Sequence, residues 1–291
     1  MDEISVKALA KINLGLDVVR RREDGYHEVK MIMQTIHLFD RVQLKKKKEA
    51  EVTLRTNLSF LPVDENNLAY RAAEMLRTEF DIKEGVEINL EKHIPVAAGM
   101  AGGSTDGAAV LYAMNEMFEL GLSKQMLMDR GVKLGADVPY CIMRGTALAE
   151  GIGEKLTQLP PMVKCPVLIA KPQISVSTRY VYEHLQLSGQ SVHPDIDKLV
   201  EKIREKDLEQ IGAAMGNILE TVTIPEHPEI EAIKSCMIKA GAVNAMMSGS
   251  GPTIFGLYAT REEAKRATEA VREQGIARQV FVTEIYNNRR N

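Results

Sequence analysis

The sequence has few of the features that mark exported, membrane-bound or disulfide-stabilised proteins. Its three cysteines, Cys141, Cys165 and Cys236, lie far apart, which leaves no CxxC metal pair and no disulfide framework. The N-terminus lacks a basic start followed by an apolar core, so no signal peptide is predicted. The longest uncharged run, 240–260, contains four glycines and a proline, which argues against a membrane helix. We therefore expect a cytoplasmic protein with no membrane partner.

The chain also lacks an excess of charge of one sign. Its net charge is −3, and 26% of its residues are charged with the two signs mixed, so no nucleic-acid partner is expected. A length of 291 residues suggests about two domains. The segment 156–166 contains three prolines and is the best boundary. We predict a first domain at 1–160 and a second at 161–291.

Two well-known phosphate-binding signatures are absent. The chain has no Gly-Lys-[Ser/Thr] loop, and Gly-x-Gly-x-x-Gly does not occur in register. Instead, a glycine-rich stretch at 94–107 contains Gly99, Gly102 and Gly103, with Ser104 and Thr105 directly after them. The sequence therefore needs a phosphate site of another kind if it binds a nucleotide.

The glycine-rich stretch is flanked by patterns typical of a strand and a helix. Alternating apolar residues at 86–90 predict a strand before it, and apolar spacing at 108–118 predicts a helix after it. This order favours an anion site, because glycines let a ligand approach the backbone and the first helical amides have no partners. The alternative is a plain helix start in which Ser104 or Thr105 serves as the cap.

Hydrophobic periodicity predicts a mixture of strands and helices. Strands are expected at 4–8, 14–19, 31–38 and 42–46, and helices at 67–80 and 124–134, with a short helix after Asp137. Beyond the boundary, we expect strands at 167–170, 242–247, 253–258 and 279–284, and helices at 195–215, 228–240 and 261–274. The ending predicts a small antiparallel sheet covered by helices, and the fold class is α+β.

Three further pieces could carry chemistry together with the glycine-rich stretch. These are Lys11 with Asn13 at the edge of a strand, Asp137 at a helix start, and the turn Ser248–Thr253. Taken singly, each has a plain explanation, because a strand lysine is usually a solvated charge, an aspartate at a helix start is usually a cap, and Ser-Gly-Ser-Gly-Pro is usually a turn.

Taken together, the motifs resemble those of the GHMP small-molecule kinases, over residues 4–258. The matching segments are Ala10-Lys11-Ile12-Asn13-Leu14, Asp24-Gly25-Tyr26-His27, Pro95 to Thr105, Gly135-Ala136-Asp137-Val138-Pro139, Lys171-Pro172 through Ser177-Thr178, and Ser248 to Thr253. The departures are small: Met100 stands where Leu is usual, Thr105 and Gly107 where Ser and Ala are usual, and Ala136 where Ser is usual. These changes leave the backbone amides of the loop intact.

The resemblance implies a two-domain fold and a reaction. The first domain would be a ribosomal-protein-S5-like ATP-binding domain, and the second a ferredoxin-like α/β-plait domain. The members that this chain resembles within the family imply ATP-dependent phosphorylation of the 2-hydroxyl of a cytidine diphosphate-linked methylerythritol, in the non-mevalonate isoprenoid route. Such a small-molecule kinase would act as a monomer or a homodimer.

The resemblance also implies roles for individual residues. Lys11 and Asp137 would be the catalytic pair. Asp137 would accept or orient the proton of the substrate hydroxyl, and Lys11 would lower the pKa of that hydroxyl or steady the developing charge. Ser104 or Thr105 would lie near Mg²⁺. The residues implied around ATP are Asn67, Lys92, Pro95, Gly99, Met100, Ala101, Gly102, Gly103, Ser104 and Thr105, and those around the substrate are Asn13, Tyr26, His27, Thr178 and Tyr182.

Two other functions are compatible with the same motifs. A mevalonate or homoserine kinase would share the glycine-rich stretch, but the segment Asp24–His27 argues against it because those acids carry no base to stack on a ring. A catalytically silent nucleotide-binding regulator would share the fold, but the presence of both Lys11 and Asp137 argues against that role. For Tyr182 the alternative is a helix-face core aromatic, and for His27 a turn histidine bonded to backbone.

Overall fold

The computed structural model describes residues 1–187 and 193–288. The chain forms two compact units, of which the first comprises Met1–Ala10, Leu38–Val96 and Ala101–Met143. The second comprises Lys11–His37, Ala97–Met100 and Arg144–Asn291. Strands β1 (Glu3–Arg21) and β2 (His27–Lys47) contribute residues to both units. The domain boundary that the sequence predicts near residue 160 stays a prediction.

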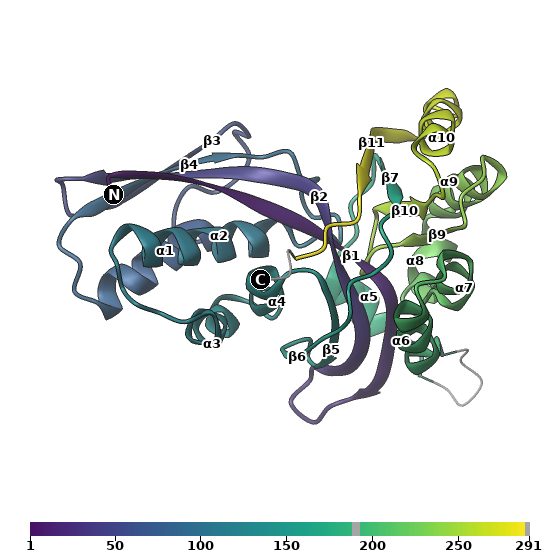
Figure 1. The fold of residues 1–291 in the computed structure, drawn as a ribbon, viewed down its shortest axis with the longest axis horizontal. Coiled ribbons are helices and arrows are strands. Elements are labelled where there is room, and N and C mark those ends of the chain that lie inside the picture. The colour runs from purple at the N-terminus through teal and green to yellow at the C-terminus, as the bar shows by residue number, and fades with distance from the viewer. Residues whose placement is uncertain (188–192, 289–291) are drawn as a thin grey trace. The chain divides into compact units, whose positions relative to one another are not determined.

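The first unit places helices on one face of a sheet. The C-terminal half of β2 pairs antiparallel with β4 (Gly85–Glu91), which pairs parallel with β3 (Val52–Thr56). Helices α1 (Leu68–Glu79) and α2 (Gly102–Met117) lie together below these strands in Figure 1, and α3 (Lys124–Leu134) and α4 (Val138–Met143) pack on α2. The buried faces of α1 and α2 contain many alanines, so the two helices can pack closely.

The second unit contains the other halves of the two long strands. The N-terminal half of β2 pairs antiparallel with β5 (Thr146–Gly151), and β5 pairs with β6 (Lys155–Gln158). Strand β1 pairs parallel with the short β8 (Gly216–Asn217) through Gly15 and Leu16.

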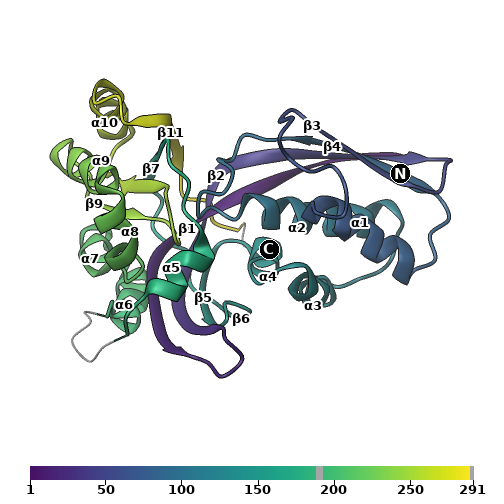
Figure 2. The ribbon, with the colours of Figure 1, turned by 180° about the vertical axis from the view of Figure 1, so that it is seen from behind.

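A separate antiparallel sheet completes the second unit. Its strand order is β11 (Ala277–Glu284), β7 (Pro166–Pro172), β10 (Ile254–Leu257) and β9 (Asn244–Met247). Helices α9 (Pro228–Lys239) and α10 (Arg261–Glu273) pack against it, as Figures 1 and 2 show. The predicted antiparallel sheet covered by helices is confirmed. The remaining helices are α5 (Thr178–His184), α6 (Ile196–Glu205), α7 (Leu208–Ala214) and α8 (Glu220–Glu226).

Three sequence predictions about element boundaries are wrong. The strands predicted at 31–38 and 42–46 are one continuous strand, β2. The strands predicted at 4–8 and 14–19 are one continuous strand, so Lys11 and Asn13 lie in the middle of β1 and not at a strand edge. The helix predicted at 195–215 is two helices, because Lys206 ends α6 in the left-handed conformation with φ 61° and Asp207 caps α7.

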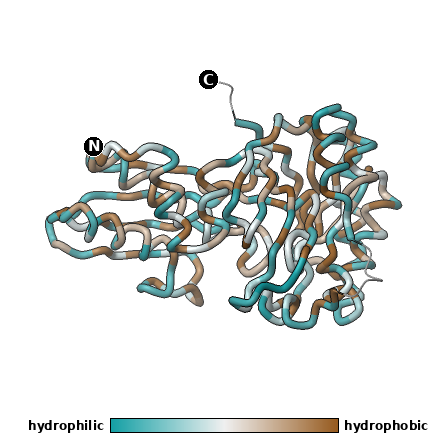
Figure 3. Tube along the Cα trace, turned by 90° about the horizontal axis from the view of Figure 1, so that it is seen from below, coloured by the Kyte–Doolittle hydropathy of each residue, from teal (hydrophilic) through white to brown (hydrophobic). Residues whose placement is uncertain are grey.

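Hydrophobic residues are distributed along the chain in short stretches. Figure 3 shows hydrophilic and hydrophobic residues interleaved along the trace in both units. Among the residues that the structure describes, no helix combines the length and the apolar character needed to cross a membrane.

Candidate active site

The glycine-rich stretch connects β4 to α2, as predicted. Helix α2 begins at Gly102, and its N-cap residue is Ala101, which has a φ of 56° and makes no side-chain capping bond. The first amides of this helix therefore have no capping side chain and lie at the positive end of its dipole. The sequence alternative, in which Ser104 or Thr105 caps the helix, is wrong because both residues lie inside its first turns. The arrangement suits an anion.

The first part of the loop packs against the second glycine-rich turn, within the second unit. Gly99 has a φ of 72°, and a Cβ on it would overlap the carbonyl oxygen of Ser248. The Ser248 hydroxyl donates to the carbonyl of Gly99 at 2.9 Å. Only glycine fits at position 99, since any side chain would be both strained and obstructed. The turn Ser248–Thr253 therefore contacts the glycine-rich loop in addition to connecting β9 and β10.

Lys11 and Asn13 lie side by side on β1, also in the second unit. Their side chains share one face of the strand because they are two residues apart. The Lys11 ammonium donates to Asn13 Oδ1 at 2.8 Å, and the Lys11 backbone amide donates to the Met100 carbonyl at 3.2 Å. Both side chains are buried, so Asn13 holds the ammonium of Lys11 in place, and the backbone of Lys11 contacts the loop residue Met100.

The residues predicted for the nucleobase also gather in the second unit. The rings of His27 and Tyr182 lie 5.2 Å apart and are tilted by 41°. Tyr26 is 62% exposed, and the Thr178 hydroxyl lies 2.8 Å from the hydroxyl of Ser250. Burial, and then the charge of Arg21, lowers the pKa of His27 below its ordinary value. Tyr26 lies in the β1–β2 connection, His27 begins β2, and Thr178 and Tyr182 lie on α5. The ring contact between His27 and Tyr182 therefore joins two elements that are far apart in the sequence.

In the first unit, the predicted ATP residues Asn67 and Thr105 have hydrogen-bond partners, and Pro95 is buried. Asn67 caps α1, because its Oδ1 accepts from the Ala69 amide at 2.9 Å, and its Nδ2 donates to the Pro62 carbonyl at 2.9 Å. Pro95 is buried at the entrance to the loop. The Thr105 hydroxyl is buried and donates to the Leu9 carbonyl at 2.8 Å. These contacts fix the backbone around the helix start.

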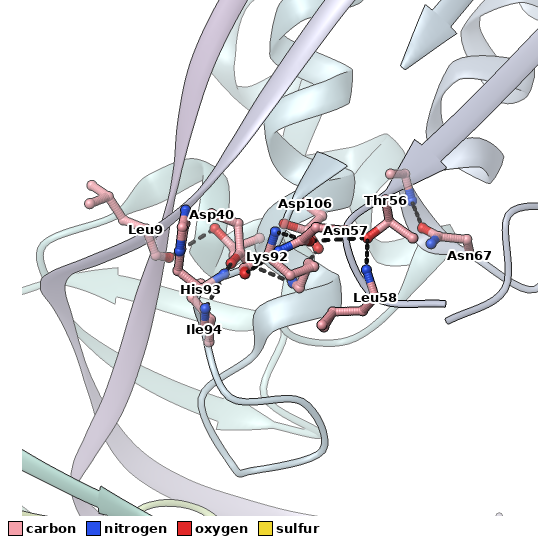
Figure 4. A network of polar contacts seen from close by, with 12 residues as sticks. Leu9, Asp40, Thr56, Asn57, Leu58, Asn67, Lys92, His93, Ile94 and Asp106 are labelled. Carbon is pink, nitrogen blue, oxygen red and sulfur yellow. Dashed lines mark hydrogen bonds and ion pairs between the residues drawn. The ribbon is translucent and has the colours of Figure 1, made fainter. Parts of the chain in front are cut away.

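Lys92 is the centre of a buried charge cluster, shown in Figure 4. Its ammonium donates to Asp106 Oδ2 at 2.6 Å and to Asp40 Oδ2, and the three side chains are at most 3% exposed. Two of the three ammonium protons are thus engaged. Contact between Lys92 and adenosine stays a prediction.

The charges in this cluster influence one another. Burial alone would lower the pKa of Lys92, but Asp106 and Asp40 outweigh it and raise that pKa. Burial raises the pKa of Asp106 well above its usual range, although Lys92 opposes the shift. Among the described residues, Asp106 Oδ1 has no hydrogen-bond partner. Two carboxylates share one ammonium here, so the cluster is tightly coupled.

Asp137 lies directly before α4 in the first unit, as the sequence predicts. Its backbone carbonyl accepts from the Cys141 amide at 3.1 Å, which starts the helix. The residue is half-buried, so the side chain is reachable while the backbone is fixed. Its neighbours Gly135 and Ala136 are small and leave room around it.

Sequence reasoning missed three residues that surround the loop entrance. Asp40, Asn57 and Asp106 all hydrogen-bond to Lys92, yet no motif singled them out. One usable signal was present. Asp40 ends an apolar run in β2 and Asp106 lies on an otherwise apolar helix, and an acid in a buried pattern needs a partner.

Two family models match the chain. The model described as the GHMP kinases N terminal domain matches residues 67–145, and the model described as GHMP kinases C terminal matches residues 188–277. Both matches agree with the α+β fold that the sequence resemblance implied.

Individual relatives match over almost the full length. The chain is 53% identical to a protein of Lachnospira eligens named 4-diphosphocytidyl-2-C-methyl-D-erythritol kinase, covering 98% of this chain and 99% of that one. A crystal structure of 4-(cytidine 5'-diphospho)-2C-methyl-D-erythritol kinase matches with a TM-score of 0.83 and 30% identity, covering 98% and 100% of the two chains.

A more distant structure shares the fold alone. It is a homoserine kinase from Cytophaga hutchinsonii, with a TM-score of 0.81 and 22% identity, covering 99% of this chain and 96% of that one. The higher identity lies with the relatives that act on a cytidine diphosphate compound. The chain therefore belongs to the GHMP kinase family, and within it to the group of the 4-diphosphocytidyl-2-C-methyl-D-erythritol kinases.

Proposed function

We propose that the protein transfers the γ-phosphoryl group of ATP to the 2-hydroxyl of 4-diphosphocytidyl-2-C-methyl-D-erythritol, giving the 2-phosphate and ADP in the non-mevalonate isoprenoid route. The observation that carries this proposal is the 53% identity over 98% of the chain to a relative with that name. The uncapped glycine start of α2 supports ATP as the phosphoryl donor, since its amides suit phosphate oxygens.

The reaction needs positioning and charge stabilisation more than covalent help from the protein. Asp137 accepts the proton of the 2-hydroxyl, whose oxygen then forms the bond to the γ-phosphorus. The bond from that phosphorus to the bridging oxygen of the β-phosphate breaks, and ADP leaves with the electron pair. Lys11 stabilises the developing negative charge, and its ammonium is already oriented by Asn13 at 2.8 Å.

We infer that Mg²⁺ accompanies the ATP and neutralises the charge of its phosphates. The donor set of this chain fits that role, because Mg²⁺ is usually held by phosphate oxygens, water and only one or two protein ligands. Among the described residues, no group of three acidic, histidine or cysteine side chains could form a metal site by itself. Ser104 is the better of the two predicted ligands, since the Thr105 hydroxyl donates to Leu9.

The residues that we propose for binding of the cytidine substrate include aromatic side chains of the second unit. We propose that Tyr26 and Tyr182 stack on the cytosine, with His27 and Thr178 beside them. The contact between the rings of His27 and Tyr182 supports a common binding surface. Asn13 would hold the sugar alcohol. The remaining predicted ATP contacts are Asn67, Lys92, Pro95 and the loop residues Gly99 to Thr105.

Three further features stay proposals. We propose functional domains at 1–160 and 161–291. We also expect the protein to be a monomer or a homodimer. A cytoplasmic location is supported by the three buried cysteines, none of which forms a disulfide.

The function is tested by the release of ADP from purified protein supplied with ATP and Mg²⁺. Initial rates are compared for the cytidine diphosphate substrate, mevalonate, homoserine and galactose. The proposal predicts turnover with the cytidine diphosphate compound and rates near background with the other three. Preference for mevalonate or homoserine would assign another GHMP activity, and no turnover with any compound would indicate a silent nucleotide-binding relative.

A further inference from the structure

Several side-chain hydrogen bonds hold the segment at the entrance to the glycine-rich loop. After β4 ends at Glu91, the chain runs through Lys92, His93 and Ile94 before the loop begins. Asp40 Oδ1 accepts from the backbone amides of both His93 and Ile94, the latter at 2.8 Å. The Asp40 side chain is completely buried, and the backbone amides supply the hydrogen bonds that a buried carboxylate needs.

Asn57 holds the same segment from the neighbouring β3 side. Its Oδ1 accepts from the Lys92 amide at 2.8 Å, and its Nδ2 donates to the Lys92 carbonyl at 3.1 Å. Both backbone groups of Lys92 are therefore bound by a single side chain, in the pattern that a neighbouring strand would provide. Figure 4 shows Asn57 and Asp40 on opposite sides of this segment.

The side chain of Lys92 extends these contacts to the helix beyond the loop. Its ammonium lies 3.3 Å from the position that a Cβ on Gly102 would occupy. The ammonium is therefore next to the first residue of α2. It binds Asp40 before the loop and Asp106 in the second turn of α2. Both sides of the loop are thus tied to one buried cation.

We propose that Asp40 and Asn57 are positioning residues for ATP, which hold the segment Lys92–Ile94 so that the amides at the start of α2 keep a phosphate-binding arrangement. Lys92 links them to Asp106, and we call these four residues the loop clamp. The inference rests on the proposed function, since it assigns the phosphates of ATP to these amides. In this proposal Asp40 and Asn57 act on ATP through the loop backbone that they hold.

The first variant is Asn57→Ala, because Asn57 is exposed and its removal leaves the buried charges untouched. We expect the Kd for ATP, measured by calorimetry without a second substrate, to rise by about 10- to 100-fold, the range that small misplacements of binding groups produce. The KM for the phosphoryl acceptor should not change. The midpoint of thermal unfolding should stay well above the assay temperature.

A conservative variant separates positioning from simple destabilisation. In Asn57→Asp, a carboxylate oxygen can still accept from the Lys92 amide but nothing donates to the Lys92 carbonyl, so ATP affinity should lie between those of the parent and Asn57→Ala. Asp40→Asn keeps an oxygen for the two backbone amides and loses the ion pair with Lys92. If it folds, it should also weaken ATP binding. Glu51→Gln, which removes an exposed partner of Lys47, is the matched control and should bind ATP like the parent.

The outcomes separate this inference from the function on which it rests. Folded Asn57→Ala with the parent's Kd for ATP would overturn the loop clamp and leave the proposed kinase activity intact. An equal loss of affinity in Glu51→Gln would also overturn it, since the effect would then be unspecific. If the parent itself bound no ATP, the proposed function and the clamp would both fall.

Discussion

At the scale of single residues, Gly99 shows most clearly how the loop depends on side-chain size. Its φ of 72° and its approach to the Ser248 carbonyl leave no room for a Cβ. We predict that Gly99→Ala loses ATP binding and has a lower unfolding temperature, because the two glycine-rich segments must separate.

Gly103 supplies the matched control for that variant. It lies in the first turn of α2, and a Cβ there would be 3.9 Å from Leu68 Cδ1, which is ordinary contact. Gly103→Ala should therefore fold as well as the parent, since alanine favours the helix more than glycine does. Equal unfolding temperatures for Gly99→Ala and Gly103→Ala would show that the close approach at Gly99 has no energetic importance.

Asp137 carries the prediction about chemistry. Asp137→Asn keeps the shape of the side chain and the backbone bond that starts α4, but it removes the proton acceptor. We expect kcat to fall by roughly 10²- to 10⁴-fold, the usual range for general acid–base catalysis, with little change in either KM. Steady-state kinetics with both substrates varied measure this, and a kcat within a few-fold of the parent would leave Asp137 only a helix-starting role.

Tyr26 and Tyr182 carry the prediction about the nucleobase. Stacking on a base is worth about 1–3 kcal/mol per aromatic contact, so removing either ring should raise the KM of the cytidine substrate by roughly tenfold or more. The KM for ATP should stay the same. The loss should fall on KM rather than kcat, because the base is remote from the transferred phosphoryl group. Kinetics of Tyr26→Ala and Tyr182→Ala provide the test, and a loss of ATP affinity instead would move the cytidine pocket elsewhere.

At the scale of elements, α1 allows a structural role to be separated from a ligand role. Asn67 caps this helix through the Ala69 amide. Asn67→Ala should cost about 0.5–2 kcal/mol in the free energy of unfolding, whereas Asn67→Asp keeps a capping oxygen and should cost much less. Denaturant unfolding gives both values.

The same two variants also test the predicted contact between Asn67 and adenosine. If the amide of Asn67 reaches the nucleoside, both variants should weaken ATP binding, including the one that keeps the cap. Unchanged ATP affinity in Asn67→Asp would restrict the residue to its capping role.

Elements with a strong local pattern were predictable from the sequence. The helices at 67–80, 124–134 and 261–274 agree with α1, α3 and α10 to within about one residue at each end. They combine regular apolar spacing with clear caps such as Asn67, Ser123 and Thr260. Local chemistry decided these boundaries.

Elements that depend on distant partners were not predictable in the same way. Strand β3 went unpredicted, and it pairs in parallel with β4, which lies about thirty residues further along the chain. The long β1 was divided in two because Lys11 and Asn13 interrupt its apolar pattern, whereas the folded chain buries both as partners of each other.

The residues of the candidate site also fall into two groups, those that the sequence revealed and those that it did not. The glycines, Lys11 and Asp137 were recognised because their motifs together resemble those of one family, although each alone has a plain explanation. Asp40 and Asn57 were missed because their significance is created by one partner, Lys92, which follows them by 52 and 35 residues. A single sequence can indicate that an acid such as Asp40 in an apolar run needs a partner, but it does not identify Lys92 as that partner.

At the scale of the whole molecule, each compact unit is built from several segments that are not consecutive in the sequence. Strands β1 and β2 contribute to both compact units. The glycine-rich stretch does so as well, with 97–100 in one unit and the start of α2 in the other. A proline-rich segment such as 156–166 can mark a boundary between consecutive domains, but it carries no information about units assembled from separate segments.

The most direct test of the account is phosphorus NMR of a reaction containing the purified protein, ATP, Mg²⁺ and 4-diphosphocytidyl-2-C-methyl-D-erythritol. We predict a new phosphomonoester resonance that grows in equal amount with ADP, while the resonances of the cytidine diphosphate linkage remain. ADP accompanied only by inorganic phosphate would show hydrolysis rather than transfer. That result, or the absence of any new resonance, would contradict the assignment of this chain as a kinase for that substrate.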